Sequence, residues 1–176
     1  MSITFIKGDI MTSSCQTLVN PVNCVGVMGK GLALQFKERY PQMFEKYKYY
    51  CDKKLLRPGM LWIYTANDGK KVLCFPTKDD WKNPSKVEWI EEGLKKFCDV
   101  YKEKKILSAA FPLLGAGCGG LKESVSLRLL ETYLCNVEIP IEIYVRTIPM
   151  DEQIGKKVGL LESRGFEAVS LSLKNA

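Results

Sequence analysis

Two glycine-rich segments constrain the fold of this chain more than any other feature of its sequence. The first covers residues 22–31, VNCVGVMGKG, and the second covers residues 112–120, PLLGAGCGG. Each follows an apolar run typical of a buried strand and precedes a helical pattern. Glycines let backbone N–H groups turn into one concavity, and a helix N-terminus behind them adds partial positive charge. Two such segments on one sheet predict a diphosphate held from both sides.

The absence of histidine excludes several classes of enzyme. With no histidine in 176 residues, Ser-His-Asp and Cys-His catalysis and the HExxH zinc sites are ruled out. The seven cysteines form no CxxC pair, so we expect no disulfide framework, no metal and no cofactor, and a reducing, cytoplasmic compartment. No charged-then-apolar leader and no membrane-length apolar run is present, which predicts no membrane partner. The length predicts one domain over residues 1–176, and we expect a monomer.

The net charge of +6 is spread over lysines on the helical stretches, which are typical of a solvated face. This balance permits a nucleotide or nucleic-acid partner without requiring one.

Strand and helix patterns interleave along the whole chain. Apolar runs predict strands, and 3.6-residue periodicity predicts helices. Asn83 is expected to cap one helix with Pro84 at its first position, and residues 67–69 read as a hairpin turn. The expected strands are 3–7, 17–20, 60–64, 72–75, 106–111, 139–145 and a last edge strand at 166–173, and the expected helices are 32–40, 43–51, 84–101, 125–133 and 151–164. This order predicts an α/β fold, a three-layer α/β/α sandwich with a mixed central sheet, whose ligand lies beyond the carboxyl ends of the strands.

Two familiar nucleotide-binding motifs fit these segments poorly. Residues 115–120 formally satisfy GxGxxG, but too little chain follows them for the second half of a dinucleotide-binding fold. The first segment lacks the GxxxxGK[ST] spacing, and Gly31 stands where a magnesium-binding Ser or Thr is needed. A dehydrogenase and an NTPase are therefore disfavoured.

Four motifs occur in the order seen in macro domains. They are KGDI at residues 7–10, VNPVN at 19–23, the first glycine segment and the second. Over nearly its whole length the chain resembles that family, which implies ADP-ribose binding. Residues 22–37 and the FPTKDDW stretch at 75–81 resemble the DarG branch, whose members remove ADP-ribose from thymidine bases in DNA. The human terminal ADP-ribose protein glycohydrolase is a relative in the same branch.

The resemblance implies an ADP-ribosyl glycohydrolase that acts on ADP-ribosylated thymidine in single-stranded DNA, with a cognate ADP-ribosyltransferase toxin as a partner. A non-catalytic ADP-ribose reader remains an alternative. A hydrolase of protein-linked ADP-ribose or of O-acetyl-ADP-ribose is a second alternative.

The resemblance also implies roles for particular residues. Asp9 would read the adenine amine, although a plain helix cap competes with that role. Asn23 would contact the distal ribose, and Cys24 and Cys118 are expected to be small hydrophobes rather than nucleophiles. The implied ADP-ribose ligands are Gly8, Asp9, Ile10, Asn23, Gly29, Lys30, Gly31, Thr77, Leu114, Gly115, Ala116, Gly117, Cys118 and Gly119.

Lys78 and Asn23 are the implied catalytic residues. In the human relative the matching lysine is considered a nucleophile that works with an aspartate after the second loop, whereas this chain has Lys122 there. We therefore expect Lys78 to act through its charge, either by stabilising negative charge on the departing thymine nitrogen or by orienting water at the anomeric carbon. Beyond it, Trp81, Lys82 and Lys86 are expected to stack on a base and hold phosphates, with helix packing as the alternative for Trp81.

Overall fold

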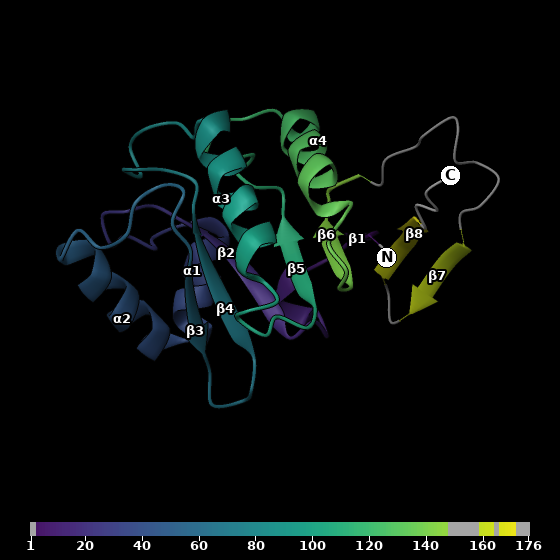
Figure 1. The fold of residues 1–176 in the computed structure, drawn as a ribbon, viewed down its shortest axis with the longest axis horizontal. Coiled ribbons are helices and arrows are strands. Elements are labelled where there is room, and N and C mark those ends of the chain that lie inside the picture. Colours follow the sequence, from purple (N-terminus) through teal and green to yellow (C-terminus); the bar gives the residue numbers. More distant parts are fainter. Residues whose placement is uncertain (1–2, 148–158, 164–165, 172–176) are drawn as a thin grey trace.

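The computed structural model describes residues 3–147, 159–163 and 166–171, and these residues form one eight-stranded sheet with helices on both faces (Figure 1). The strands are β1 (Ile3–Lys7), β2 (Thr17–Val22), β3 (Trp62–Thr65), β4 (Lys71–Pro76), β5 (Ala109–Pro112), β6 (Ile141–Tyr144), β7 (Gly159–Ser163) and β8 (Phe166–Leu171). The helices are α1 (Gly31–Arg39), α2 (Pro41–Asp52), α3 (Val87–Val100) and α4 (Glu123–Leu134), with a 3₁₀ turn η1 (Ile10–Thr12).

The sheet has a parallel centre and antiparallel edges. Its strand order is β3-β4-β2-β5-β6-β1-β8-β7. Strands β4, β2, β5, β6 and β1 pair in parallel, while β3 joins β4 and β8 joins β1 in antiparallel pairs. The predicted mixed sheet is thus confirmed, and the five parallel strands point their carboxyl ends toward one edge.

Two hydrophobic clusters fill the space above and below the sheet. On β4, Leu73 packs into the cluster under α3 and α4, while its neighbour Cys74 packs into the cluster under α1 and α2. Because successive side chains of a strand point to opposite faces, a strand buried on both sides is apolar throughout. Figure 1 shows α3 and α4 side by side across one face. The three-layer sandwich predicted from the sequence is confirmed.

Helix α3 approaches the sheet unusually closely because of Gly93. A Cβ placed on Gly93 would lie 2.3 Å from Cζ of Phe75, a ring that is fully buried on β4. The contact seats the helix directly over the strand that ends at Pro76. The position of α3 is therefore tied to the strand that leads into residues 77 and 78.

Several sequence predictions need correction. A helix was expected over residues 151–164, but residues 159–163 form β7 and the rest of that range lies outside the described residues. The strand at 166–171 is β8, which lies between β1 and β7 and so is not at the edge. Helix α3 begins at Val87 with Lys86 at its N-cap, so Asn83 is not the cap. The hairpin turn at 67–69 is confirmed, because β3 and β4 pair around Gly69 with its φ of +83°.

Candidate functional site

The candidate site lies at the carboxyl-end edge of the parallel strands, where four connecting segments meet. They follow β4, β2, β5 and β1 and lie along the edge in that order, with β6 between the last two. Both glycine segments are among them, as the sequence predicted. Ligands of open α/β sheets bind at this edge.

The first glycine segment is held in shape by Asn23. Its Oδ1 accepts hydrogen bonds from the N–H groups of Val25 (3.1 Å) and Val27 (3.3 Å), and its Nδ2 donates to the Val27 carbonyl at 2.6 Å. The phenol of Tyr47 lies 2.8 Å from the Asn23 carbonyl and 2.9 Å from its Oδ1. Asn23 therefore shapes the segment with one amide oxygen and one N–H, and Tyr47 fixes Asn23 in turn.

Tyr47 was expected only as part of the apolar stripe of a helix. It is fully buried on α2, and desolvation by burial raises the pKa of its phenol, so the hydroxyl stays a hydrogen-bond donor. The only signal in the sequence was that a buried tyrosine needs a polar partner.

The end of the first segment opens helix α1. Lys30 is its extended N-cap and Gly31 is its first residue, with a φ of +60°. A Cβ placed on Gly31 would lie 3.9 Å from Sγ of Cys118. The two glycine segments thus lie side by side, next to the N-terminus of a nine-residue helix that favours anions.

The second glycine segment has one tight glycine and one open glycine. A Cβ on Gly119 would lie 2.2 Å from Oγ of Ser85 and 2.3 Å from the Gly115 carbonyl, whereas a Cβ on Gly117 would meet nothing within 4 Å. Gly115 has a φ of +73°, and the Gly119 carbonyl accepts a hydrogen bond from the Ser85 N–H at 2.9 Å. Gly119 therefore serves packing, while Gly117 leaves space beside the backbone.

Lys78 lies where the connecting segments meet. Only 8% of the residue is exposed, and its Nζ donates hydrogen bonds to the carbonyls of Cys118 and, at 3.2 Å, Trp81. The N–H of Thr77 donates to the Val22 carbonyl at 2.9 Å, which holds the segment against the end of β2. A buried ammonium beside two glycine segments is a positive charge available to a ligand held there.

The cysteines of the two segments differ in their surroundings. Cys24 donates a hydrogen bond to the Lys78 carbonyl, with its Sγ 3.3 Å from the oxygen, and burial raises its pKa to about 12. Cys118 is exposed. A neutral, half-buried thiol at Cys24 fits the expected small hydrophobe better than a nucleophile.

Asp9 lies farther along the same edge, after β1. Its Oδ1 accepts a hydrogen bond from the Met11 N–H at 2.9 Å, so the carboxylate caps η1. Ile10 is buried, and so is Leu114 of the second glycine segment, so both would reach a ligand only through their backbone. The helix-cap alternative is therefore realised, and adenine recognition by the remaining Asp9 oxygen stays a prediction.

The three predicted nucleic-acid contacts follow Lys78 directly. Trp81 is 52% exposed, which leaves much of the side chain accessible to a ligand, and plain helix packing stays the alternative. Lys82 and Lys86 are exposed as well. Ser85, which the sequence did not single out as a ligand, is buried with an Oγ that has no hydrogen-bond partner among the described residues.

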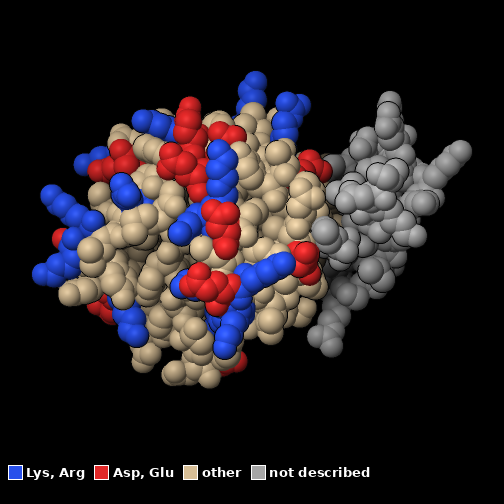
Figure 2. Space-filling model, viewed as in Figure 1, with Lys and Arg blue, Asp and Glu red and all other residues tan. Residues whose placement is uncertain are grey.

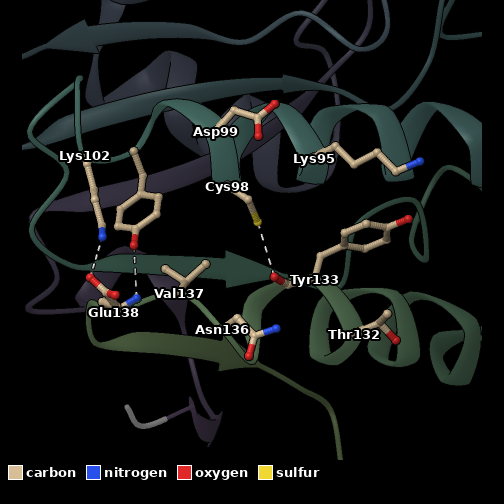
Figure 3. Close-up of a pocket in the computed structure, with 10 residues that line it drawn as sticks. Lys95, Cys98, Asp99, Lys102, Thr132, Tyr133, Asn136, Val137 and Glu138 are labelled. Carbon is tan, nitrogen blue, oxygen red and sulfur yellow. Dashed lines mark hydrogen bonds and ion pairs between the residues drawn. The ribbon is translucent and has the colours of Figure 1, made fainter.

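A separate pocket of about 490 Å³ lies between the C-terminal ends of α3 and α4 (Figure 3). Its walls are cross-linked by a hydrogen bond from Cys98 Sγ to the Tyr133 carbonyl (3.3 Å) and by an ion pair between Lys102 and Glu138 (2.5 Å). None of its lining residues is a predicted site residue. Within the described residues there is no cluster of three or more metal-ligating side chains. Nor is any described helix long and apolar enough to cross a membrane.

Two curated relatives resemble the chain over most of its length. It is 42% identical over 146 residues to the DNA ADP-ribosyl glycohydrolase of Mycobacterium tuberculosis, covering 81% of this chain and 42% of the relative. It is 38% identical over 171 residues to a DNA ADP-ribosyl transferase-DNA ADP-ribosyl glycohydrolase fusion protein of Thermosipho africanus, covering 87% and 43%. The chain thus spans about two fifths of the length of these relatives.

Solved structures agree with these matches. The macrodomain of Mycobacterium tuberculosis DarG superposes with a TM-score of 0.78 at 40% identity, covering 81% of this chain and 96% of that one. Thermosipho africanus DarTG in complex with ADP-ribose superposes with a TM-score of 0.79 at 38% identity, covering 86% and 44%. The family described as Macro domain matches residues 19–130, a range that holds the end of β2, both glycine segments and Lys78. The chain belongs to the macro domain family.

Proposed function

We propose that this chain is an ADP-ribosyl glycohydrolase that removes ADP-ribose from thymidine bases of single-stranded DNA. The observation that carries the proposal is the buried residue Lys78, whose ammonium donates a hydrogen bond to Cys118 of the second glycine segment and whose carbonyl accepts one from Cys24 of the first. A module that only binds ADP-ribose needs no such cation at the sugar end. The names of the Mycobacterium tuberculosis and Thermosipho africanus relatives support the choice of DNA as the modified substrate.

In the proposed complex the ligand extends along the edge of the sheet. The adenine lies near Asp9, the diphosphate lies between Gly29–Gly31 and Gly115–Gly117, and the distal ribose lies near Asn23 and Lys78. Backbone N–H groups and the α1 N-terminus would supply donors to the diphosphate. This arrangement places the glycosidic bond beside the one buried lysine of the site.

Hydrolysis adds the hydroxyl of water to the anomeric carbon and returns a proton to the departing thymine nitrogen. As the C–N bond breaks, its electron pair moves onto that nitrogen, and the Lys78 ammonium stabilises the negative charge that develops there. Its two carbonyl partners, Cys118 and Trp81, hold the ammonium in place before the reaction. Lys122, the N-cap of α4, stands where the human relative has its aspartate. A charge-only role for Lys78 is therefore the mechanism we propose.

The deciding experiment compares two substrates. The protein is incubated with an oligonucleotide carrying ADP-ribosylated thymidine and with a protein ADP-ribosylated on glutamate, and released ADP-ribose is measured. We expect release from the DNA. Release only from the protein would favour the protein-directed alternative, and release from neither, with ADP-ribose still bound, would favour the reader.

The Lys78→Ala variant tests the catalytic role. An electrostatic group that acts mainly in the transition state changes rate more than ground-state affinity. We expect a loss of about 100- to 1,000-fold in hydrolysis with binding of free ADP-ribose nearly unchanged. The exposed lysine Lys96 on α3 supplies the control, Lys96→Ala. Borohydride added during turnover should trap no lysine adduct; an adduct would establish the covalent mechanism instead.

A cognate ADP-ribosyltransferase is the partner that we propose for the chain. The Thermosipho africanus relative, named as a fusion of a transferase and a glycohydrolase, supports this pairing. Co-purification of the chain with a transferase encoded beside it would test the partnership directly.

A further inference from the structure

An exposed tryptophan lies three residues beyond the proposed catalytic lysine. We call residues 79–86 the tryptophan loop, after Trp81. The indole is 52% exposed, and the Lys82 ammonium lies 5.5 Å from its ring centroid. The Lys86 ammonium lies 4.6 Å from the ring centroid of Trp89, in the first turn of α3. Each lysine ammonium therefore lies near an aromatic ring. Neither lysine takes part in an ion pair among the described residues.

The two aspartates of the loop accept hydrogen bonds from other residues of the loop. Oδ1 of Asp79 accepts hydrogen bonds from the Asp80 N–H (2.7 Å) and from Nδ2 of Asn83 (3.3 Å), and Oδ1 of Asp80 accepts one from the Lys82 N–H (3.0 Å). The pKa of Asp79 is held below its usual value, chiefly by the hydrogen bond from the Asp80 N–H. The carboxylates are thus engaged with the loop, which presents the indole on a fixed turn.

The loop is anchored to both glycine segments. The Cys24 N–H donates to the Asp79 carbonyl at 2.9 Å, and the Ser85 N–H donates to the Gly119 carbonyl at 2.9 Å. The carbonyl of Trp81 accepts a hydrogen bond from Lys78 itself. Because both ends and the middle of the loop are fixed to the site, the backbone that carries the exposed indole is held next to Lys78.

We propose that Trp81 is the stacking platform for a DNA base adjacent to the ADP-ribosylated thymidine, with Lys82 and Lys86 near the flanking phosphates. The inference rests on the proposed function and adds how the strand is recognised. A flat, exposed aromatic ring on a fixed turn is the element that binds single-stranded nucleic acid without reading its sequence. In a duplex the faces of the bases are stacked on one another and cannot contact the indole, so the substrate must be single-stranded.

Stacking, rather than charge, supplies most of this recognition. Residues 78–86 contain three lysines and two aspartates. Basic and acidic side chains are also interspersed over α3 on the face in Figure 2, without a continuous basic patch. Two phosphate contacts predict a shallow salt dependence, a slope of about −1.4 in log K against log salt concentration.

The test separates the neighbouring nucleotides from the reaction itself. Hydrolysis of ADP-ribosylated thymidine is measured in two forms, as the isolated nucleoside and within a single-stranded oligonucleotide. We expect Trp81→Ala to reduce kcat/KM on the oligonucleotide by about 5- to 150-fold. Hydrolysis of the nucleoside should be unchanged, because the variant keeps the backbone carbonyl at residue 81 that Lys78 contacts. Trp81→Phe should retain part of the advantage. The control is Tyr49→Ala, which removes a 57% exposed aromatic ring on α2.

Binding is also measured without chemistry. Unmodified single-stranded oligonucleotide should quench the tryptophan fluorescence of the wild-type protein, and Trp81→Phe should remove most of that quench. Loss of the quench in Trp81→Phe supports the platform even if neither modified substrate is hydrolysed, in which case the proposed function fails alone. Equal hydrolysis of the oligonucleotide by Trp81→Ala and wild type overturns the inference. An equal loss of kcat/KM on the oligonucleotide and on the nucleoside also overturns the inference, because Trp81 would then act on the modified nucleotide itself.

Discussion

At the scale of single residues, the candidate site depends on side chains whose hydrogen bonds are directed at backbone groups. Asn23 shapes one glycine segment from within, and Lys78 bridges the other glycine segment to the tryptophan loop. Because backbone positions decide where N–H groups point, Asn23 determines the geometry of an anion site that it does not form by itself, whereas the hydrogen bonds of Lys78 hold its own ammonium in place.

Tyr47 is predicted to be a positioning residue for the distal ribose. Tyr47→Phe removes the hydroxyl that contacts the Asn23 carbonyl and Oδ1, so the first glycine segment loses one support. We expect ADP-ribose to bind about 2- to 10-fold more weakly, as measured by calorimetry. Tyr64→Phe is the control, because Tyr64 OH bonds only to Gln42 among the described residues, at 3.3 Å. Equal affinities of both variants would contradict the prediction.

The two loop cysteines should differ in reactivity. At pH 8 a thiol with a pKa of about 12, as at Cys24, is thiolate in only about one molecule in 10,000, and its alkylation should rise tenfold per pH unit up to that pKa. The exposed Cys118 should react with iodoacetamide first, and ADP-ribose should protect it, since it lies beside Gly31. Peptide mass spectrometry measures both rates. Rapid labelling of Cys24 at pH 8, or no protection of Cys118, would count against the site.

The sequence predicted much of the site because its motifs end strands. Lys78 follows the strand predicted at 72–75, and the structure places it beside Cys118. The contact between Tyr47 and Asn23 could not be predicted, since it joins α2 to a loop through packing between distant parts of the chain. Asn83 precedes Pro84, a pattern that predicts a helix cap, but in the structure its side chain bonds Asp79 and its N–H bonds the Asp80 carbonyl in a turn before α3.

At the scale of elements, the second glycine segment needs glycine for two reasons, open space for a ligand at residue 117 and close packing at residue 119. Two variants should separate these effects. Gly117→Glu puts a carboxylate where a Cβ has open space, so the free protein should melt nearly as wild type while ADP-ribose binding is lost. Gly119→Ala should instead lower the free energy of unfolding by about 1–3 kcal/mol, because its Cβ overlaps Ser85 and the Gly115 carbonyl. Thermal melts and calorimetry on both variants, with Gly117→Ala as the control, measure this. Normal ligand binding by Gly117→Glu would put the diphosphate elsewhere.

The sequence predicted the strands of the parallel core and the existence of β8, but it predicted neither β7 nor the position of β8 in the sheet. Apolar runs and the glycines near their ends identified β1, β2, β4, β5 and β6. The bounds of β1 match the prediction, and those of the other four differ by up to three residues. Three residues of β7, Leu160 to Glu162, favour helices, yet the strand forms by pairing Leu160 with Val169 and Leu161 with Ala168. Helix propensity is a weak term that strand pairing overrides. Such pairing depends on β8 lying against β1, which no local pattern reveals.

At the scale of the whole molecule, the site is extended rather than central. Lys78 follows β4 and Asp9 follows β1, four strand spacings apart, or about 19 Å. The two ends should therefore contribute independently. Asp9→Ala should weaken ADP-ribose binding about tenfold or more, by removing a charged acceptor, and Lys78→Ala should slow hydrolysis alone. In the double variant both effects should combine to within about twofold, measured by calorimetry and single-turnover hydrolysis.

Asp9→Asn keeps an oxygen for the Met11 N–H and so separates the helix cap from adenine recognition. If Asp9→Asn binds as wild type while Asp9→Ala does not, the cap alone matters and the adenine assignment fails. Strong coupling between the Asp9 and Lys78 substitutions would show that the ligand does not span the edge as proposed.

The antiparallel hairpin of β7 and β8 has a consequence for how the chain avoids self-association. Without it, β1 would be the border of the sheet, with a row of open backbone donors and acceptors along a strand that includes the apolar residues Ile3 and Phe5. Such a border is a template onto which a second copy can add its own strand. Because β8 pairs with β1 from Ile3 to Lys7, the backbone groups of β1 are no longer open, and β7 becomes the edge strand. The hairpin thus protects the parallel core from aggregation, at the opposite side of the sheet from Lys78.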